Sequence, residues 1–266
     1  MKLLLTLLAI LSAPAFAQER APQKIVAPTD LPAKQNFHLY LLMGQSNMAG
    51  RGKVDAESRP ENPRLLVFNR DGKWAVAADP LHWDKSIAGV GLGLAFAKAM
   101  ADAEPGATIG LIPCAVGGTP LSVWQKGGRQ YNTAVALAKA AATSGTLKGV
   151  LWHQGESDSG KAETASTYGQ RFEKMVKDLR TDLGIEDLPV VAGELGEFHV
   201  QRVGANSQTI NDALHAAAKT LPRVACVDAK QLKDGGDKLH FDAASQREFG
   251  RRYAKAMLAL EAKPAK

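Results

Sequence analysis

Short, almost entirely apolar runs alternate along this chain with longer stretches of mixed polarity, and this alternation limits the fold more than any other feature. The apolar runs cover residues 37–43, 64–69, 108–114, 149–152, 188–194 and 224–228. Between two of them, over residues 168–183, large apolar residues recur every three or four positions, as on one face of a helix. Apolar strands separated by helices are typical of a parallel sheet covered on both faces. The sequence therefore predicts an α/β fold.

Polar residues gather directly after several of these runs. Gln45 and Ser46 follow the first run and residues 153–158 follow the fourth, while the third run opens into the loop of residues 115–124. The carboxyl ends of parallel strands meet at one edge of a sheet, and α/β folds bind their ligands there. We therefore expect a functional site at this edge.

Ser46 is the leading candidate for a nucleophile. The first run ends at Gly44, and a serine two residues later would be carried to the mouth of the sheet by a strand-to-helix turn. The same position would also suit a helix cap formed by Ser46 or Asn47. Ser46 alone therefore does not decide between a catalytic and a structural role.

Asp237 and His240 form an Asp-x-x-His pair just before the last predicted helix. The aspartate can fold back and accept a hydrogen bond from Nδ1 of the imidazole, which leaves Nε2 free to take a proton from a serine hydroxyl. An isolated pair of this kind would fit a surface turn equally well. Together with Ser46, the pair predicts a serine nucleophile with its general base.

The first 17 residues have the pattern of a secretory signal peptide. Lys2 precedes a short apolar run, and residues 15–17 form a small-x-small cleavage pattern. The run is too short to span a bilayer, so we expect cleavage near Gln18, export to a bacterial periplasm or the medium, and no stable membrane insertion afterwards. Residues 18–36 are predicted to form an extended lead-in, and residues 37–262 a single catalytic domain.

The charge pattern gives little indication of a macromolecular partner. The formal net charge is +6, from 33 basic and 27 acidic residues that are scattered along the chain. Such scattering indicates a solvated surface and argues against nucleic-acid binding, while an acidic polysaccharide remains compatible with it. Cys114 and Cys226 are the only cysteines, and either a disulfide or two buried thiols would fit an exported protein. The pattern does not predict an oligomeric state.

Five ordered blocks carry a resemblance to a known family. They are residues 44–52 (GQSNMAGRG), 89–93 (GVGLG), 113–119 (PCAVGGT), 152–158 (WHQGESD) and 237–241 (DKLHF). Together they resemble the sialate O-acetylesterase and carbohydrate esterase family 6 group of the SGNH (GDSL-like) hydrolases. The resemblance implies a three-layer α/β/α, flavodoxin-like sandwich with a mainly parallel, five-stranded sheet. It also implies hydrolysis of acetyl esters on carbohydrates, without a metal or cofactor.

The resemblance further implies a role for each matching residue. It makes Ser46 the nucleophile, His240 the general base and Asp237 the residue that orients the histidine. The oxyanion would be held by the Ser46 N–H, by a glycine N–H of the 89–91 turn, with Gly91 preferred to Gly89, and by the Gln154 side chain. The wider superfamily has Gly-x-Asn-Asp where residues 154–157 read Gln-Gly-Glu-Ser, which makes Gln154 a departure from the usual donor.

Other interpretations remain open on the sequence alone. Glu156 and Asp158 could be a carboxylate pair for glycoside hydrolysis, although Glu156 would also suit hydrogen bonds to neighbouring backbone. His153, Glu156 and His240 could be drawn as a metal site. Trp124 could contact a sugar or belong to the core. The chain could also be a non-catalytic sugar-binding protein, or an SGNH esterase or thioesterase acting on lipid acyl chains.

Overall fold

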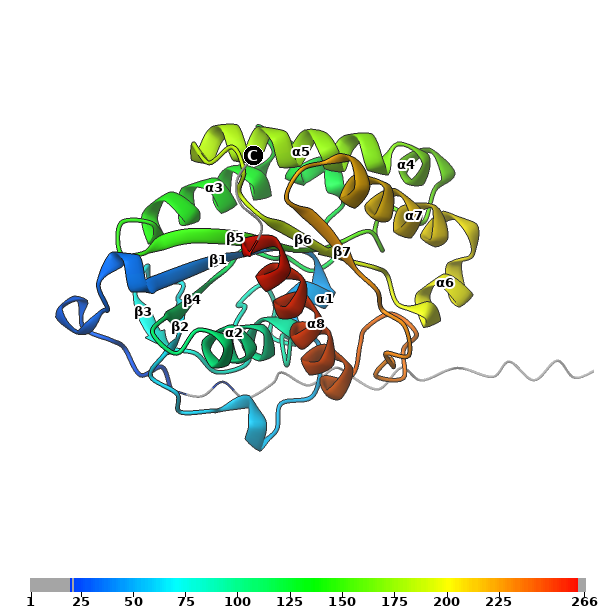
Figure 1. The fold of residues 1–266 in the computed structure, drawn as a ribbon. Coiled ribbons are helices and arrows are strands. Elements are labelled where there is room, and N and C mark those ends of the chain that lie inside the picture. Colours follow the sequence, from blue (N-terminus) through cyan, green and yellow to red (C-terminus); the bar gives the residue numbers. More distant parts are fainter. Residues whose placement is uncertain (1–19, 21, 263–266) are drawn as a thin grey trace, which may run out of the picture.

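The computed structural model describes residues 20 and 22–262 (Figure 1). The predicted signal peptide over residues 1–17 lies outside the described residues. Within the described part, no helix is both long enough and apolar enough to cross a membrane.

A central sheet of seven strands organises the described chain, in the order β3-β2-β4-β1-β5-β6-β7. The strands are β1 (Phe37–Gly44), β2 (Leu65–Phe68), β3 (Trp74–Val76), β4 (Thr108–Pro113), β5 (Thr146–His153), β6 (Val190–Gly193) and β7 (Val224–Val227). All neighbours pair in parallel except β2 and β3, which form an antiparallel pair.

The predicted α/β class is confirmed, but the expected count of five strands is too low. Each of the six apolar runs forms a strand, and β3 adds a seventh at the edge of the sheet. β3 has only three residues and follows the Asp71–Gly72 turn, so it is too short to show a strand period in the sequence.

Helices cover both faces of the sheet, which gives three layers (Figure 1). α3, α4, α5 and α7 lie over one face, and α2 and α8 over the other. The α-helices are α1 (Ser46–Ala49), α2 (Leu92–Ala103), α3 (Arg129–Ala141), α4 (Ala162–Ser166), α5 (Tyr168–Leu183), α6 (Glu197–Val203), α7 (Ala205–Thr220) and α8 (Ala243–Glu261). Short 3₁₀ turns are η1 (Pro28–Asp30), η2 (Lys34–Asn36), η3 (Ala56–Ser58) and η4 (Leu121–Trp124).

β1 lies in the middle of the sheet, and its side chains alternate between the two apolar layers. Leu39, Leu41 and Met43 belong to one buried cluster, while Tyr40 and Leu42 belong to the other. A strand buried on both faces must be apolar at every position, which is the reason for the uninterrupted apolar run in the sequence. This central position also places the end of β1 in the middle of the carboxyl edge of the sheet.

The described part of the lead-in combines extended segments with the 3₁₀ turns η1 and η2, and its residues 24–26 lie against the sheet. The Val26 N–H donates to the Trp74 carbonyl (2.9 Å), and the Val76 N–H donates to the Lys24 carbonyl (2.9 Å). Because an edge strand presents unpaired backbone groups, these bonds protect the outer edge of β3.

Candidate active site

The turn after β1 requires a glycine. Gly44 has φ +131°, and a Cβ atom there would lie 2.0 Å from the carbonyl oxygen of His153 on the neighbouring strand. Only glycine allows this close approach and this backbone conformation. The Gln45 N–H then donates to the same carbonyl (2.9 Å), and Ser46 begins the single-turn helix α1. The turn therefore places Ser46 at the carboxyl edge of the sheet, where the sequence predicted it.

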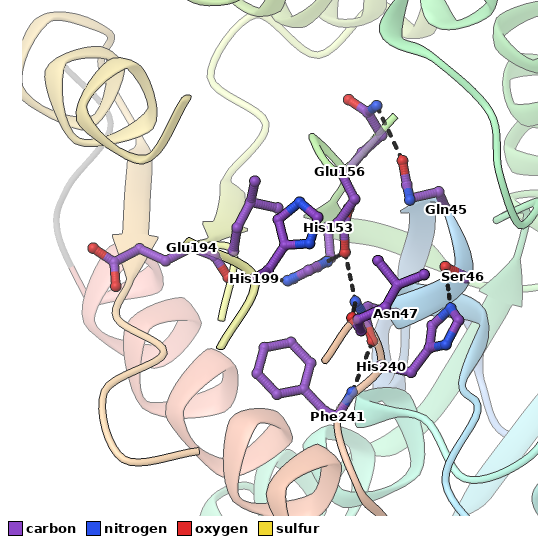
Figure 2. A network of polar contacts seen from close by, with 12 residues as sticks. Gln45, Ser46, Asn47, His153, Glu156, Glu194, His199, His240 and Phe241 are labelled. Atoms are coloured by element: carbon purple, nitrogen blue, oxygen red, sulfur yellow. Dashed lines mark hydrogen bonds and ion pairs between the residues drawn. The ribbon is translucent and has the colours of Figure 1, made fainter. Parts of the chain in front are cut away.

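The structure brings Ser46 and His240 together although 194 positions separate them in the chain (Figure 2), and Asp237 is bonded to the other nitrogen of the imidazole. The Ser46 hydroxyl lies 3.0 Å from Nε2 of His240, and Nδ1 of the same ring lies 2.6 Å from Oδ2 of Asp237. The imidazole is thus bonded through both nitrogens, with the hydroxyl on one side and the carboxylate on the other.

The second oxygen of Asp237 holds the loop that carries His240. Oδ1 accepts the backbone N–H groups of Leu239 and His240, each at 2.8 Å. Burial alone would raise the pKa of the Asp237 carboxyl, but the hydrogen bonds from the backbone and ring of His240 outweigh it and lower the pKa. Asp237 therefore stays charged and keeps the ring turned with Nε2 toward the serine.

A cavity of about 310 Å³ opens beside Ser46 and His240. Its lining includes Gly117 and Gly118 from the loop after β4, and Lys85 and Arg202 at exposed positions. In the described part of the chain, neither of these two cations has an ion-pair partner. The cavity therefore combines backbone groups close to the serine with two positive charges on its border.

A buried ion pair fixes the glycine loop on one side of this cavity. One carboxylate oxygen of Asp84 accepts hydrogen bonds from the Arg51 guanidinium (2.7 Å) and from the Gly117 N–H (2.8 Å). Burial alone would raise the pKa of Asp84, but the hydrogen bond and charge of Arg51 reverse this and lower the pKa. The carboxylate therefore remains charged and holds the loop.

Gly91 and Gly89 are not among the residues that line this cavity, although the sequence assigned Gly91 to the oxyanion hole. The Gly91 N–H donates to the buried carboxylate of Asp79, and the Gly89 N–H donates to the Gly50 carbonyl (3.1 Å). β4 lies next to β1, and the loop after β4 brings Gly117 and Gly118 to the cavity that Ser46 lines. The order of the strands, which the sequence does not show, determines which glycine loop lies beside Ser46.

Gln154, which the sequence predicted as an oxyanion donor, is not among the residues that line the cavity. Its side chain is fully buried, and Nε2 lies within hydrogen-bond distance of Asp158 Oδ2 (2.7 Å), Gln45 Oε1 (3.2 Å) and the Thr119 carbonyl (3.2 Å). These acceptors use both N–H groups of the amide. The carboxamide that does line the cavity belongs to Gln45.

Asp158 and Glu156 do not form a carboxylate pair. Asp158 is buried, and its oxygens accept the Arg171 guanidinium (2.9 Å), the Leu121 N–H (2.8 Å) and the Gln154 amide. Glu156 lies at the cavity and is bonded to the Asn47 side chain (2.5 Å), not to neighbouring backbone as the sequence suggested. The two carboxylates therefore have separate structural partners, which leaves the glycoside-hydrolysis hypothesis without support.

The described residues also show the surroundings of His153, Trp124 and the two cysteines. His153 is fully buried, and burial lowers its pKa, so the ring is neutral at 3.7 Å from Glu156. The described residues hold no group of three or more His, Cys, Asp or Glu suited to a metal. Trp124 is a core residue that donates to Thr119 (3.1 Å), and Cys114 and Cys226 are free thiols.

Sequence reasoning missed the structural role of Asn47 and the position of Arg202. Asn47 was considered only as a possible helix cap, yet its side chain contacts Glu156 and the His240 loop (Figure 2). Its place next to the serine was the one signal available. Arg202 near the end of α6 had no such signal, because it reaches the cavity only through the fold.

Comparison with known proteins identifies the family. Residues 36–259 match the profile of carbohydrate esterases described as sialic acid-specific acetylesterases. A probable carbohydrate esterase of Arabidopsis thaliana is 35% identical over 240 residues, which cover 83% of this chain and 90% of that protein. The X-ray structure of the Arabidopsis protein has a TM-score of 0.77 at 33% identity, over 85% of this chain and 98% of that one.

Two more distant structures share the fold. NanS has a TM-score of 0.71 at 19% identity, over 87% of this chain and 99% of its own. A carbohydrate acetylesterase from Xanthomonas citri has a TM-score of 0.65 at 19% identity, over 85% of this chain and 56% of its own. The resemblance inferred from the sequence blocks is thus confirmed, and this chain belongs to the sialic acid-specific acetylesterase family of carbohydrate esterases, a family of carboxylic ester hydrolases.

Proposed function

We propose that this protein removes acetyl groups from carbohydrates through an acyl-enzyme formed on Ser46. The observation that carries the proposal is the continuous hydrogen-bonded series from the Ser46 hydroxyl through His240 to Asp237. As the serine oxygen attacks the acetyl carbonyl, Nε2 of His240 takes the hydroxyl proton, and Asp237 stabilises the imidazolium that forms.

The same histidine then serves both halves of the reaction. Collapse of the tetrahedral intermediate breaks the ester bond, and His240 gives its proton to the departing sugar oxygen. A water molecule enters, His240 removes one of its protons, and the resulting attack on the acetyl-serine releases acetate and restores the Ser46 hydroxyl.

The oxyanion donors in this proposal differ from those that the resemblance implied. We assign the Ser46 N–H, the Gly118 N–H and the Gln45 amide to this role. Gln45 and Gly118 line the cavity beside the serine. Oε1 of Gln45 accepts hydrogen bonds from Gln154 and from the Ser157 N–H (3.2 Å), which leaves Nε2 as the donor end of the amide.

The border of the cavity supports an acidic sugar as the substrate. Lys85 and Arg202 line it from separate segments of the chain and have no ion-pair partner among the described residues. A sugar carboxylate bound there would gain charge-assisted hydrogen bonds from groups that are otherwise solvated. The rest of the lining combines glycines with the apolar side chains of Ile87 and Leu239, which suits a small acyl group.

Replacement of the nucleophile tests the proposal. We expect Ser46→Ala to lower kcat for an aryl acetate by about 10⁴-fold or more, because the acyl-enzyme cannot form. A fluorophosphonate, which bonds to an activated serine oxygen with loss of fluoride, should label the native protein and leave Ser46→Ala unlabelled. Ser166→Ala, at an exposed helical serine, is the control and should keep both properties.

The outcomes separate the remaining alternatives. More than a tenth of native activity in Ser46→Ala would remove this serine from the mechanism, and a native protein that is never labelled would indicate a non-catalytic sugar-binding protein. A preference for octanoyl over acetyl esters would favour the lipid acyl hypothesis. We expect the acetyl ester to be preferred.

A further inference from the structure

The side chain of Asn47 holds the backbone on both sides of His240. Nδ2 donates to the carbonyl of Leu239 (3.0 Å), and Oδ1 accepts the N–H of Phe241 (3.1 Å) (Figure 2). These are the two residues that flank the histidine in the chain. Asn47 in turn directly follows Ser46, so one carboxamide joins the serine turn to the histidine loop.

Asn47 is itself fixed from two further segments. Its Nδ2 also donates to Oε1 of Glu156 (2.5 Å), from the loop after β5, and its backbone carbonyl accepts Nε2 of Gln246 (3.0 Å), from α8. Asn47 and Gln246 are almost completely buried, and Glu156 is 9% exposed. A buried charge-assisted hydrogen bond such as the one from Asn47 to Glu156 holds the Asn47 carboxamide in one orientation.

The histidine loop needs an anchor because much of it is exposed. Residues 235–238 are exposed, and Gly236 and Lys238 have φ of +104° and +54°. Phe241 packs into the core, with rings of Phe198 and Phe249 5.0 and 5.2 Å away, but this contact fixes only one end of the segment. The distance between a base and its nucleophile must be held to about 0.5 Å, and apolar packing alone does not define it so closely.

We propose that Asn47 and Glu156 form a positioning pair that sets Nε2 of His240 at bonding distance from the Ser46 hydroxyl. Asn47 does not line the cavity, so its effect passes through the histidine loop and not through substrate contact. The inference rests on the proposed function, because it assigns the pair to the same serine and histidine. It adds a role for the buried carboxylate of Glu156 and for the residue after the nucleophile.

The first test removes the carboxamide. In Asn47→Ala we expect the rate of fluorophosphonate labelling and kcat for an aryl acetate to fall about 10²-fold, the cost of a displacement near 1 Å. KM should change less than threefold, because the cavity lining is intact. A residue that only stabilised the fold would not produce this difference between kcat and KM in the folded protein.

Asn69→Ala provides a matched control. Asn69 is equally buried, in the turn between β2 and β3, and it accepts the N–H groups of Asp71 (3.0 Å) and Lys73 (2.9 Å) and donates to Gln23 (2.7 Å). It therefore loses a similar set of hydrogen bonds away from the cavity. We expect Asn69→Ala to be destabilised like Asn47→Ala and to keep native labelling.

The second test exchanges donor and acceptor between the two members of the pair. Asn47→Asp keeps the acceptor for Phe241 but sets a second carboxylate against Glu156, so labelling should fall at least as far as in Asn47→Ala. Adding Glu156→Gln supplies an amide donor to the new aspartate and removes the repulsion. We expect the double variant to be labelled at least tenfold faster than Asn47→Asp.

Two results would overturn the inference. One is labelling of Asn47→Ala within twofold of Asn69→Ala; the other, which decides the matter if Asn47→Ala does not fold, is a double variant no more reactive than Asn47→Asp. A native protein that is not labelled at all would instead refute the proposed function. The two failures are therefore distinguishable.

Discussion

At the scale of single residues, the site depends on which carboxamide faces the reacting atoms. Gln45 and Gln154 are hydrogen-bonded to each other, and only Gln45 lines the cavity. Gln45→Glu keeps an oxygen for Gln154 and Ser157 but replaces the amide donor by an oxygen. We expect kcat/KM for an aryl acetate to fall by about 10² to 10³-fold, the usual cost of losing one oxyanion donor.

The same variant distinguishes a donor from a structural residue. Gln45 is only 3% exposed, so an ionised carboxylate at this position is costly to bury, and the activity of Gln45→Glu is therefore compared with that of the native protein at a temperature where thermal unfolding shows the variant to be folded. Activity within fivefold of native would show that Gln45 does not contact the oxyanion. Other donors would then have to stabilise it.

Much of the site was predictable at this scale, and the parts that were not depend on the fold. Ser46, Asp237 and His240 could be found because the chemistry demands those residue types after an apolar strand and before a helix. The oxyanion glycine could not be chosen from the sequence with certainty, because two glycine-rich turns compete there, at 89–93 and 117–118. Only the position of β4 beside β1 shows which one reaches the serine.

At the scale of elements, a carboxyl group buried against the start of α2 should make stability depend on pH. Asp79 is almost completely buried, one of its oxygens has no hydrogen-bond partner, and the backbone N–H groups of Gly91 and Leu81 donate to its carboxylate. Burial raises the pKa of Asp79 to about 8, against an ordinary value of 3.8, and the two backbone donors oppose the rise without cancelling it.

The sign of the effect follows from linkage. A pKa that is higher in the folded than in the unfolded protein means that folding favours the protonated form, so its contribution is complete below about pH 4 and is lost as the pH rises through about 8. We expect Asp79→Asn, which cannot ionise, to have a higher unfolding temperature than the native protein at pH 9 and a similar one at pH 4. Thermal denaturation at both pH values measures this, and a difference that does not vary with pH would exclude an ionising Asp79.

The strands and helices themselves were the most predictable level. Six of the seven strands coincide with apolar runs, and α8 begins where Asp242 accepts the Ser245 N–H (2.7 Å). β3 and the pairing of residues 24–26 with it were not foreseen, because they are edge features held by backbone bonds and carry no apolar period.

At the scale of the whole molecule, two of the scattered positive charges come together at the cavity. The formal net charge of +6 is spread along the sequence, but Lys85 and Arg202 meet at the cavity from segments more than a hundred residues apart. We expect the double variant Lys85→Ala with Arg202→Ala to raise KM at least tenfold for acetylated acidic sugars, because two charge-assisted contacts are lost. For a neutral aryl acetate, kcat/KM should change less than threefold.

Ionic strength and a matched surface variant provide two controls for the role of these charges. Raising the ionic strength from 0.01 to 0.5 M should weaken binding of the acidic sugar in the native protein and have little effect in the double variant, since exposed charges are screened. Lys174→Ala with Lys177→Ala removes two exposed lysines of α5 and should leave both substrates unaffected, because each lysine is paired within its own helix and lies outside the cavity. Equal losses of kcat/KM for neutral and acidic esters in the Lys85→Ala, Arg202→Ala variant would show that the two residues shape the site but do not bind the charged group of the sugar.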